Sequence, residues 1–401
     1  MTGPKVVAIG DCVRPAETWN PLKATGDSEF SYIDLSAVDQ ERKEISEARI
    51  IACAEAPSRA RQLVEEGDVL VSTVRPNLNG VARVGASHHG ATASTGFCVL
   101  RPVVGKLDSG YAFQWVKSPS FVADMVSKAT GASYPAVSER IILESRIPLP
   151  PFPAQRRIAA ILDQADALRA KRREALAQLD SLTQSIFIEM FGDPVSNPLG
   201  WKQVTLSDVL LSIDSGWSPI CLDRPVADGE WGVLKLGAVT SCTYDPAANK
   251  ALPASSAPDP SIEVKTGDLL FSRKNTYDLV AACAYVGTTI PRLMMSDLIF
   301  RLQVRATAKL DKRYLHALLT NGKKRHEVQK LAGGSSGSMP NISKSRLLGF
   351  LIEMPPLQLQ QTFATRTQAI ESLKATHRAA LAESDALFAS LQHRAFAGQL
   401  S

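Results

Sequence analysis

Residues 150–191 read PPFPAQRRIAAILDQADALRAKRREALAQLDSLTQSIFIEMF, and this stretch decides the fold. Its apolar side chains recur with the seven-residue period of helices that pack along their length. Prolines are tolerated in a first helical turn, and Gly192-Asp193-Pro194 is expected to end the helix. About 38 helical residues at ~1.5 Å each predict a rod of roughly 57 Å. The expected seam consists of Ile158, Ala165, Arg172, Leu179 and Ile186, with Ile161, Leu168, Ala175 and Leu182.

The chain contains this stretch twice. Residues 355–396 read PPLQLQQTFATRTQAIESLKATHRAALAESDALFASLQHRAF and align without a gap at an offset of 205, with 14 of 42 positions identical. Both copies begin with Pro-Pro, share a Gln five residues later and end on Phe. A second long helix of equal length is therefore predicted. Its expected seam consists of Phe363, Ile370, His377, Ser384 and Leu391, with Leu373, Ala380 and Leu387.

A single rod of this kind would leave an apolar stripe exposed to water. Two rods of equal length can bury their stripes against each other, and the domain between them favours an antiparallel coiled coil with pseudo-twofold symmetry. The polar residues Arg172 and His377 would then meet near the middle and fix the register. The alternative is that each helix packs on its own domain.

The remaining sequence is expected to form two mixed α/β (α+β) domains in tandem. The duplication continues upstream more weakly, as in GDVLVS at 67–72 and GDLLFS at 267–272. Short β-rich runs are predicted at 68–74, 97–103, 233–239 and 298–304, and helical patches at 111–128 and 312–331. The predicted organisation is a first domain at 1–149, a helix at 150–194, a second domain at 195–354 and a helix at 355–401.

Turn-rich segments after the GD-containing strands carry side chains suited to DNA. Arginine pairs with guanine edges, asparagine pairs with adenine edges, and lysine neutralises phosphate. A basic cluster near residue 324 could contact the DNA backbone, although a solvated helix face explains it equally well. The candidate DNA-binding residues are Arg75, Asn77, Asn79, Arg83, His88, Arg273, Lys274, Asn275, Tyr277, Lys323, Lys324 and Arg325.

Composition excludes several classes of protein. The 401 residues carry a net charge of +5 and 45% hydrophobic residues, which fits a cytoplasmic globular protein of about two domains. No stretch is long and apolar enough for a membrane span. The cysteines form no C-x-x-C pair, so a zinc site is not expected. We find no nucleotide-binding P-loop, no methyltransferase motif and no hydrolase motif, so no catalytic residue, metal or cofactor is predicted.

These features together resemble the specificity subunit of type I restriction–modification enzymes. The two paired stretches carry the resemblance, together with GASYPAVS leading to Pro150-Pro151 and GSSGSMPNIS leading to Pro355-Pro356. The resemblance covers essentially the whole chain and is specific in the helices. It implies two target-recognition domains, each reading one half of a split, asymmetric site on double-stranded DNA, with the helices as a ruler between them.

The resemblance also implies partners. Two adenine-N6 methyltransferase subunits that bind S-adenosylmethionine would dock largely through the helices, and a translocating nuclease subunit would join for restriction. Three alternatives remain open: a specificity subunit whose partner fuses methylation and cleavage, a coiled-coil scaffold that does not bind DNA, and a nuclease acting alone. The only nuclease-like stretch, Pro258-Asp259 followed by Glu263-Val264-Lys265, is too short to place its acids around a metal.

Overall fold

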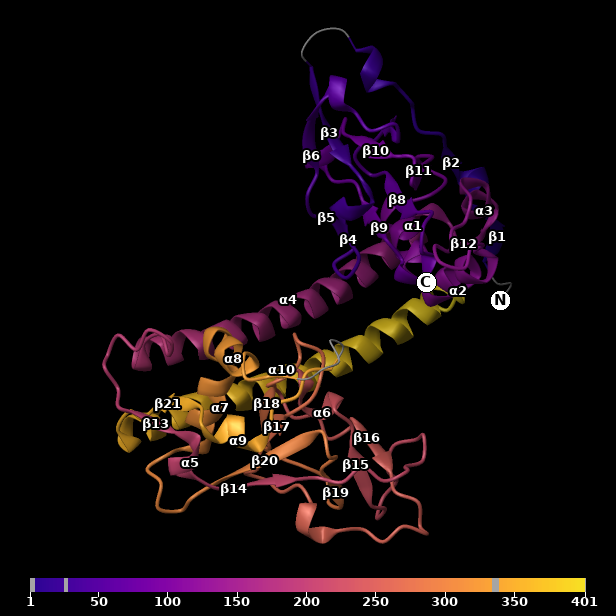
Figure 1. Ribbon diagram of the computed structural model, residues 1–401. Helices are drawn as coiled ribbons and strands as arrows, with labels where there is room; N and C mark the ends of the chain where they lie inside the picture. Colours follow the sequence, from indigo (N-terminus) through magenta and orange to yellow (C-terminus); the bar gives the residue numbers. More distant parts are fainter. Residues whose placement is uncertain (1–3, 25–27, 334–338, 401) are drawn as a thin grey trace. The chain divides into compact units, whose positions relative to one another are not determined.

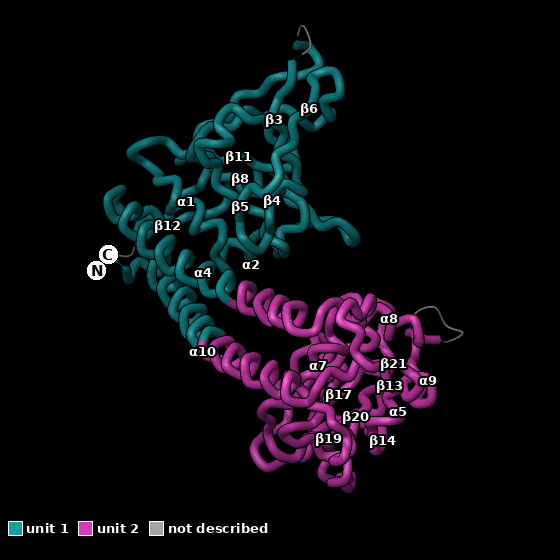
Figure 2. Tube along the Cα trace, turned by 90° about the vertical axis from the view of Figure 1, so that its left-hand side faces the viewer, with its two compact units in different colours: residues 1–175, 377–401 teal, residues 176–376 magenta. Residues whose placement is uncertain are grey.

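The computed structural model describes residues 4–24, 28–333 and 339–400. The chain divides into two compact units, shown in different colours in Figure 2. Unit 1 comprises residues 1–175 and 377–401, and unit 2 comprises residues 176–376. Each unit contains a set of β-sheets and one part of each long helix. None of the described helices is both long enough and apolar enough to cross a membrane.

Unit 1 is built on two four-stranded sheets, ordered β6-β3-β10-β7 and β2-β11-β8-β9, with β1 paired to β12 and β4 paired to β5. Its strands are β1 (Lys5–Ala8), β2 (Val13–Arg14), β3 (Glu29–Ile33), β4 (Val38–Asp39), β5 (Glu44–Ile45), β6 (Arg49–Ala52), β7 (Ala60–Leu63), β8 (Val69–Ser72), β9 (Val81–Arg83), β10 (Thr92–Ser94), β11 (Phe97–Pro102) and β12 (Arg146–Leu149). Its short helices are α1 (Ser109–Val116), α2 (Pro119–Lys128) and α3 (Glu139–Glu144).

Unit 2 has a four-stranded sheet ordered β14-β20-β17-β18, a three-stranded sheet ordered β16-β15-β19, and β13 paired to β21. Its strands are β13 (Gln203–Thr205), β14 (Leu210–Ser215), β15 (Gly232–Leu234), β16 (Asn249–Ala251), β17 (Leu269–Ser272), β18 (Cys283–Tyr285), β19 (Leu293–Met294), β20 (Ile299–Val304) and β21 (Leu351–Glu353). Its short helices are α5 (Leu206–Val209), α6 (Gly237–Thr240), α7 (Lys312–Thr320), α8 (Gly322–Gln329) and α9 (Lys344–Leu348).

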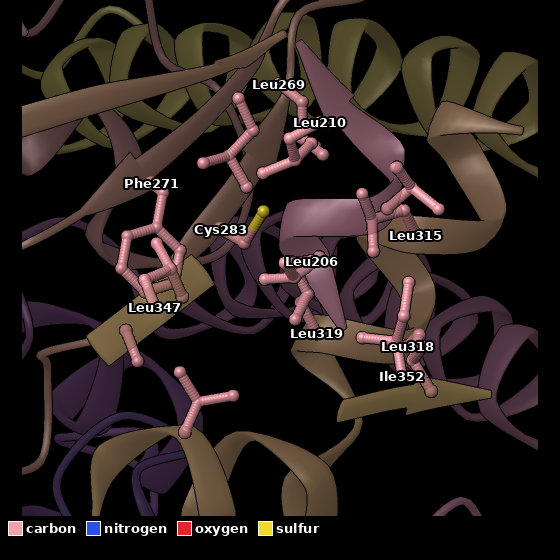
Figure 3. Packing of buried hydrophobic residues seen from close by; sticks show 14 of the residues in the cluster. Leu206, Leu210, Leu269, Phe271, Cys283, Leu315, Leu318, Leu319, Leu347 and Ile352 are labelled. Atoms are coloured by element: carbon pink, nitrogen blue, oxygen red, sulfur yellow. The ribbon is translucent and has the colours of Figure 1, made fainter. Parts of the chain in front are cut away.

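One inner strand in each unit, β8 in unit 1 and β17 in unit 2, is buried on both faces because its side chains alternate between two cores. In unit 1, Val69 and Val71 of β8 pack toward the helices, and Leu70 packs toward the neighbouring sheet. In unit 2, Leu269 and Phe271 of β17 lie in the helix-side core, which Figure 3 shows with Leu315, Leu318 and Leu319 of α7. The mixed α/β expectation is therefore confirmed for both halves.

Three sequence predictions of local structure need correction. The run at 233–239 forms a strand only at Gly232–Leu234, and Gly237–Thr240 is a short helix. The helical patch at 111–128 is two helices, because Ser118 caps a new helix that begins with Pro119. The patch at 312–331 is likewise divided, with Asn321 capping α8. A side chain that caps a helix satisfies its free N–H groups, so a cap inside a helical pattern starts a new helix.

The long helices are α4 (Phe152–Phe191) and α10 (Leu357–Phe396), drawn in magenta and yellow in Figure 1. In unit 2, α4 and α10 run antiparallel, because Asp180 contacts Lys374 and Phe187 contacts Phe363. In unit 1, residues 152–175 of α4 lie beside residues 377–396 of α10 (Figure 2). The expected antiparallel helix pair is confirmed.

Four leucines of the predicted seam are displaced by one residue. The series that starts at Ile158 and the series that starts at Phe363 are buried or half-buried throughout. The four leucines of the second series are wrong, because they are 45–57% exposed, whereas Ala175 and Ala380 of the same series are half-buried as predicted. The four leucines are Leu168, Leu182, Leu373 and Leu387. Their C-terminal neighbours fill the seam instead: Arg169, Thr183, Lys374 and Phe388. Ile161 of the same series is half-buried, whereas the following residue, Leu162, is fully buried. That Arg172 and His377 meet stays a prediction.

Each unit attaches its helix through the same buried glutamine. In unit 1, the Gln155 side chain accepts a hydrogen bond from the Asp108 N–H and donates to the carbonyls of Lys106 and Pro150, at 2.9–3.0 Å. In unit 2, the Gln360 side chain accepts from the Asp311 N–H and donates to the carbonyls of Lys309 and Pro355, at 2.8–3.1 Å. This is the Gln that the two helical stretches share.

The far ends of the long helices complete the cores. In unit 2, Phe191 at the end of α4 packs edge-on against Tyr314, with ring centroids 4.8 Å apart. In unit 1, Phe396 at the end of α10 packs edge-on against Tyr111 at 5.5 Å. Both tyrosine hydroxyls donate to a backbone carbonyl, and burial raises both tyrosine pKa values. The shared terminal Phe of the repeat therefore has the same packing role in each unit.

Candidate DNA interface

The loop after β8 carries three of the candidate residues. Two of them are exposed to solvent, and the third is hydrogen-bonded within the fold. Arg75 and Asn77 are exposed and flank the buried Pro76. Asn79 is used by the fold, because its amide donates to the Val116 carbonyl at 2.8 Å and its own carbonyl accepts from Lys43 Nζ at 2.6 Å. Burial and the nearby Lys117 lower the Lys43 pKa. Of the three candidates on this loop, Arg75 and Asn77 are thus the two that are exposed to solvent.

The remaining two candidates of unit 1 have partners. Arg83 pairs with Asp163 of α4 at 3.6 Å, with both side chains partly exposed. The His88 ring lies 3.1 Å from the Ser87 hydroxyl and is half-buried. An exposed pair of this kind contributes little to stability, so Arg83 could exchange Asp163 for phosphate at low cost.

The corresponding loop of unit 2 after β17 uses its polar residues differently. Arg273 donates to the Asn341 side chain at 3.1 Å and lies over the Phe300 ring at 5.2 Å. Asn275 is 7% exposed, and its amide oxygen accepts the Thr276 N–H. Lys274 is half-buried in a backbone bridge to Asn341, whereas Tyr277 is 51% exposed. Tyr277 is the most accessible candidate of the four on this loop.

The basic cluster on α8 is largely structural. Lys324 is 5% exposed and donates to Glu353 at 2.7 Å, so this candidate is corrected from DNA contact to buried ion pair. Arg325 donates to the carbonyls of Asp278 and Val280 and so holds the loop that carries Tyr277. Lys323 bonds to Asp193 and lowers the pKa of that carboxyl to about 2, while its own side chain stays 72% exposed.

Two surface features were missed by the sequence analysis. Tyr134 is 67% exposed, and the Arg75 guanidinium lies over its ring at 4.6 Å. In unit 2, Trp217 and Ile220 are 42% and 90% exposed on the segment between β14 and β15. The GASYPAVS motif contains Tyr134, and an aromatic residue in a turn-rich motif was the available signal. Among the described residues, no cluster of His, Cys, Asp and Glu could hold a metal.

A family model described as the type I restriction modification DNA specificity domain matches residues 58–178. The type I restriction enzyme EcoEI specificity subunit of Escherichia coli is 33% identical over 168 residues, which is 42% of this chain. The EcoDI specificity subunit of the same organism is 28% identical over 130 residues, or 31% of this chain. The matched stretch spans 28% of the length of each relative.

Two solved structures match nearly the whole chain. A structure described as the structural basis of complex assembly and conformational transition of the type I R-M system is 26% identical, with a TM-score of 0.56. That match covers 100% of this chain and 99% of the other. The type I restriction–modification S subunit from M. genitalium, 13% identical with a TM-score of 0.60, covers 98% and 96% and shares the fold. The resemblance to type I specificity subunits is confirmed.

Proposed function

We propose that this chain is the DNA-specificity subunit of a type I restriction–modification complex. The observation that carries the proposal is the full-length similarity to a type I R-M structure, in a chain whose two halves share one frame. In this role the chain is not itself catalytic. It recognises an asymmetric bipartite site on double-stranded DNA and positions the subunits that modify or cut it.

The two units share structural features, which supports two DNA-recognition domains of the same kind. Asp68, directly before β8, pairs with Arg101 at 2.8 Å, and Asp268, directly before β17, pairs with Arg301 at 3.4 Å. The exposed loops that follow these strands differ, with Arg75 in one half and Tyr277 in the other. Two domains with one scaffold and different loops would read different sequences, so the two half-sites differ.

Of the candidate residues, we propose that Arg75, Asn77, Arg83, His88, Lys274, Tyr277 and Lys323 contact DNA. They combine groups that pair with base edges and groups that neutralise phosphate. Arg273, Asn275, Asn79, Lys324 and Arg325 instead maintain the loops and helices that present them.

The exposed leucines of the long helices fit the docking of two methyltransferase subunits. Leu168 and Leu387 lie in unit 1, and Leu182 and Leu373 lie in unit 2. Each leucine precedes a seam residue by one position, and the helices of the pair are antiparallel. The two leucines of each unit therefore lie on one face of the pair. The offset of 205 relates Leu168 to Leu373 and Leu182 to Leu387, so the chain offers the same apolar contact twice. The proposed partners are two adenine-N6 methyltransferase subunits that bind S-adenosylmethionine, with restriction subunits added for cleavage.

The test is to co-express the chain with its methyltransferase in a methylation-free host and to map N6-methyladenine by single-molecule sequencing. We expect a split, asymmetric motif with adenine modified in both halves, and no modification with either protein alone. Unmodified DNA despite a stable complex of the two proteins would contradict the proposal and favour a scaffold. DNA cut by the chain alone in the presence of magnesium would favour a nuclease.

A further inference from the structure

Two backbone hydrogen bonds hold the segment that carries Arg75 against residues 135–137; we call this arrangement the backbone mount. The Arg75 N–H donates to the Pro135 carbonyl at 2.7 Å, and the Val137 N–H donates to the Thr73 carbonyl at 2.8 Å. Arg75 adopts a left-handed φ of +50°, and the following Pro76 is buried. Two hydrogen bonds and a buried proline leave the Arg75 backbone little freedom, so the direction of its side chain is set by the fold.

Unit 2 builds the same mount from its own residues. The Asn275 N–H donates to the Pro340 carbonyl at 3.4 Å, and the Ile342 N–H donates to the Arg273 carbonyl at 2.8 Å. These bonds match those of unit 1 one for one, at the repeat offsets of 200 and 205. Arg75 is therefore the structural counterpart of Asn275, and Tyr134 is the counterpart of Met339.

The side chains on the two mounts differ in kind. Arg75 is exposed, and its guanidinium stacks on the ring of Tyr134, itself 67% exposed. No carboxylate pairs with Arg75 in the part of the chain that the structure describes. In unit 2 the corresponding Asn275 is buried, and Met339 is 39% exposed. A fixed backbone with interchangeable side chains on its rim is the arrangement expected of a position that determines specificity.

We infer that Arg75 reads a guanine in one half of the DNA target and that Tyr134 is its positioning residue. The planar guanidinium presents two parallel N–H donors to O6 and N7 of guanine in the major groove. The Tyr134 ring supports the guanidinium from one side, with Cζ 4.6 Å from the ring centroid, and the N–H donors stay available to a base. Because the stack is already formed in the free protein, less side-chain freedom is lost on binding. This inference rests on the proposed function.

The experiment uses the co-expression system with single-molecule mapping of N6-methyladenine over a time course. In Arg75→Ala, one guanine of one half-site is expected to become degenerate, with discrimination at that position reduced at least about tenfold. The other half-site should stay fully specified. Tyr134→Ala should relax the same position to a smaller extent, and Tyr134→Phe, which keeps the ring, should not. Arg140→Ala, a comparably exposed arginine paired with Glu144, is the matched control and should leave the motif unchanged.

An unchanged motif in Arg75→Ala, or uniformly slower methylation at an unchanged motif, would overturn the inference. Arg75→Lys keeps charge and length and serves as the second variant if Arg75→Ala unfolds at a lower temperature. It should also weaken discrimination at that one position, because an ammonium cannot make the bidentate contact. Absence of methylation with the unsubstituted chain is a different result, since it contradicts the proposed function itself.

Discussion

Lys374 of α10 donates to Asp180 of α4 across the helix pair, with Nζ and Oδ1 2.7 Å apart. At the offset of 205 that relates the two helices, Lys374 corresponds to Arg169 and Asp180 corresponds to Asp385. Arg169 and Asp385 also form an ion pair, at 2.5 Å. In both pairs the basic side chain lies in the seam and the aspartate lies at its rim. The repeat in the sequence of the two helices therefore extends to the ion pairs between them.

The seam cations predict how the pair responds to charge. Lys374 is 6% exposed, and it contacts both Asp180 and Glu371 at 2.7–2.8 Å. Lys374→Glu places a third carboxylate beside these two, so it should destabilise unit 2 by about 2 kcal/mol or more. Lys374→Met keeps the volume and removes the charge, and it should be close to neutral because the Asp180 and Glu371 side chains, 62% and 44% exposed, stay hydrated. Urea unfolding followed by circular dichroism measures both. Equal losses of stability in the two variants would show that packing, not charge, decides this position.

The displaced seam predicts which leucines stabilise the fold. Leu162 is fully buried in the core of unit 1, whereas Leu168, six residues later, is 55% exposed. Leu162→Ala should cost about 2–5 kcal/mol, because it removes buried methyl groups and leaves a cavity. Leu168→Ala should change stability by less than about 0.5 kcal/mol. Thermal unfolding of the two variants makes the comparison, and a larger loss in Leu168→Ala would restore the original seam.

The sequence predicted the long helices but misplaced four leucines of their contact surface, for a physical reason. Hydrophobic periodicity selects leucines, and here four leucines face solvent while Arg169 and Lys374 fill the seam with their long apolar stems. The true period is visible only when the stem of a basic residue is counted as apolar. The leucines that do not fit the seam are the ones we propose for partner docking, so the positions where the pattern failed coincide with the proposed docking surface.

Single loop residues could not be assigned from sequence. Asn79 and Asn275 look equally suited to adenine, yet one holds the Val116 carbonyl and the other is buried in its own turn. Lys324 belongs to a basic run, but Glu353, 29 residues away, holds it in the core. These outcomes depend on which distant carbonyl or carboxylate the fold brings near, and the local pattern carries no information about that.

The shared glutamine predicts a matched effect in both units. Gln155→Leu removes three hydrogen bonds and leaves the Asp108 N–H and two carbonyls without that partner. The free energy of unfolding should fall by at least about 2 kcal/mol, because buried polar groups left unpaired are costly. Gln360→Leu should behave alike in unit 2. Gln164→Leu, at an exposed position of α4, is the control and should be nearly neutral. A Gln155→Leu variant as stable as the control would mean that the three bonds contribute nothing.

The exposed leucine pairs predict where the methyltransferase subunits bind. Leu168→Ser and Leu387→Ser together should weaken binding of one methyltransferase subunit at unit 1 by tenfold or more, because a buried leucine contributes roughly 1.5–3 kcal/mol. Leu182→Ser with Leu373→Ser should do the same at unit 2. Calorimetric titration of the partner onto each variant should then show one weakened site and one intact site.

The control for this titration is Val104→Ser, which removes a side chain that is 93% exposed and lies away from both long helices in the sequence. It should leave both sites intact, and all three proteins should melt at nearly the same temperature, because exposed side chains add little to stability. If both sites weaken together in either leucine variant, the two copies of the contact are not independent. If neither weakens, the partners bind elsewhere, and the leucine stripe requires another explanation.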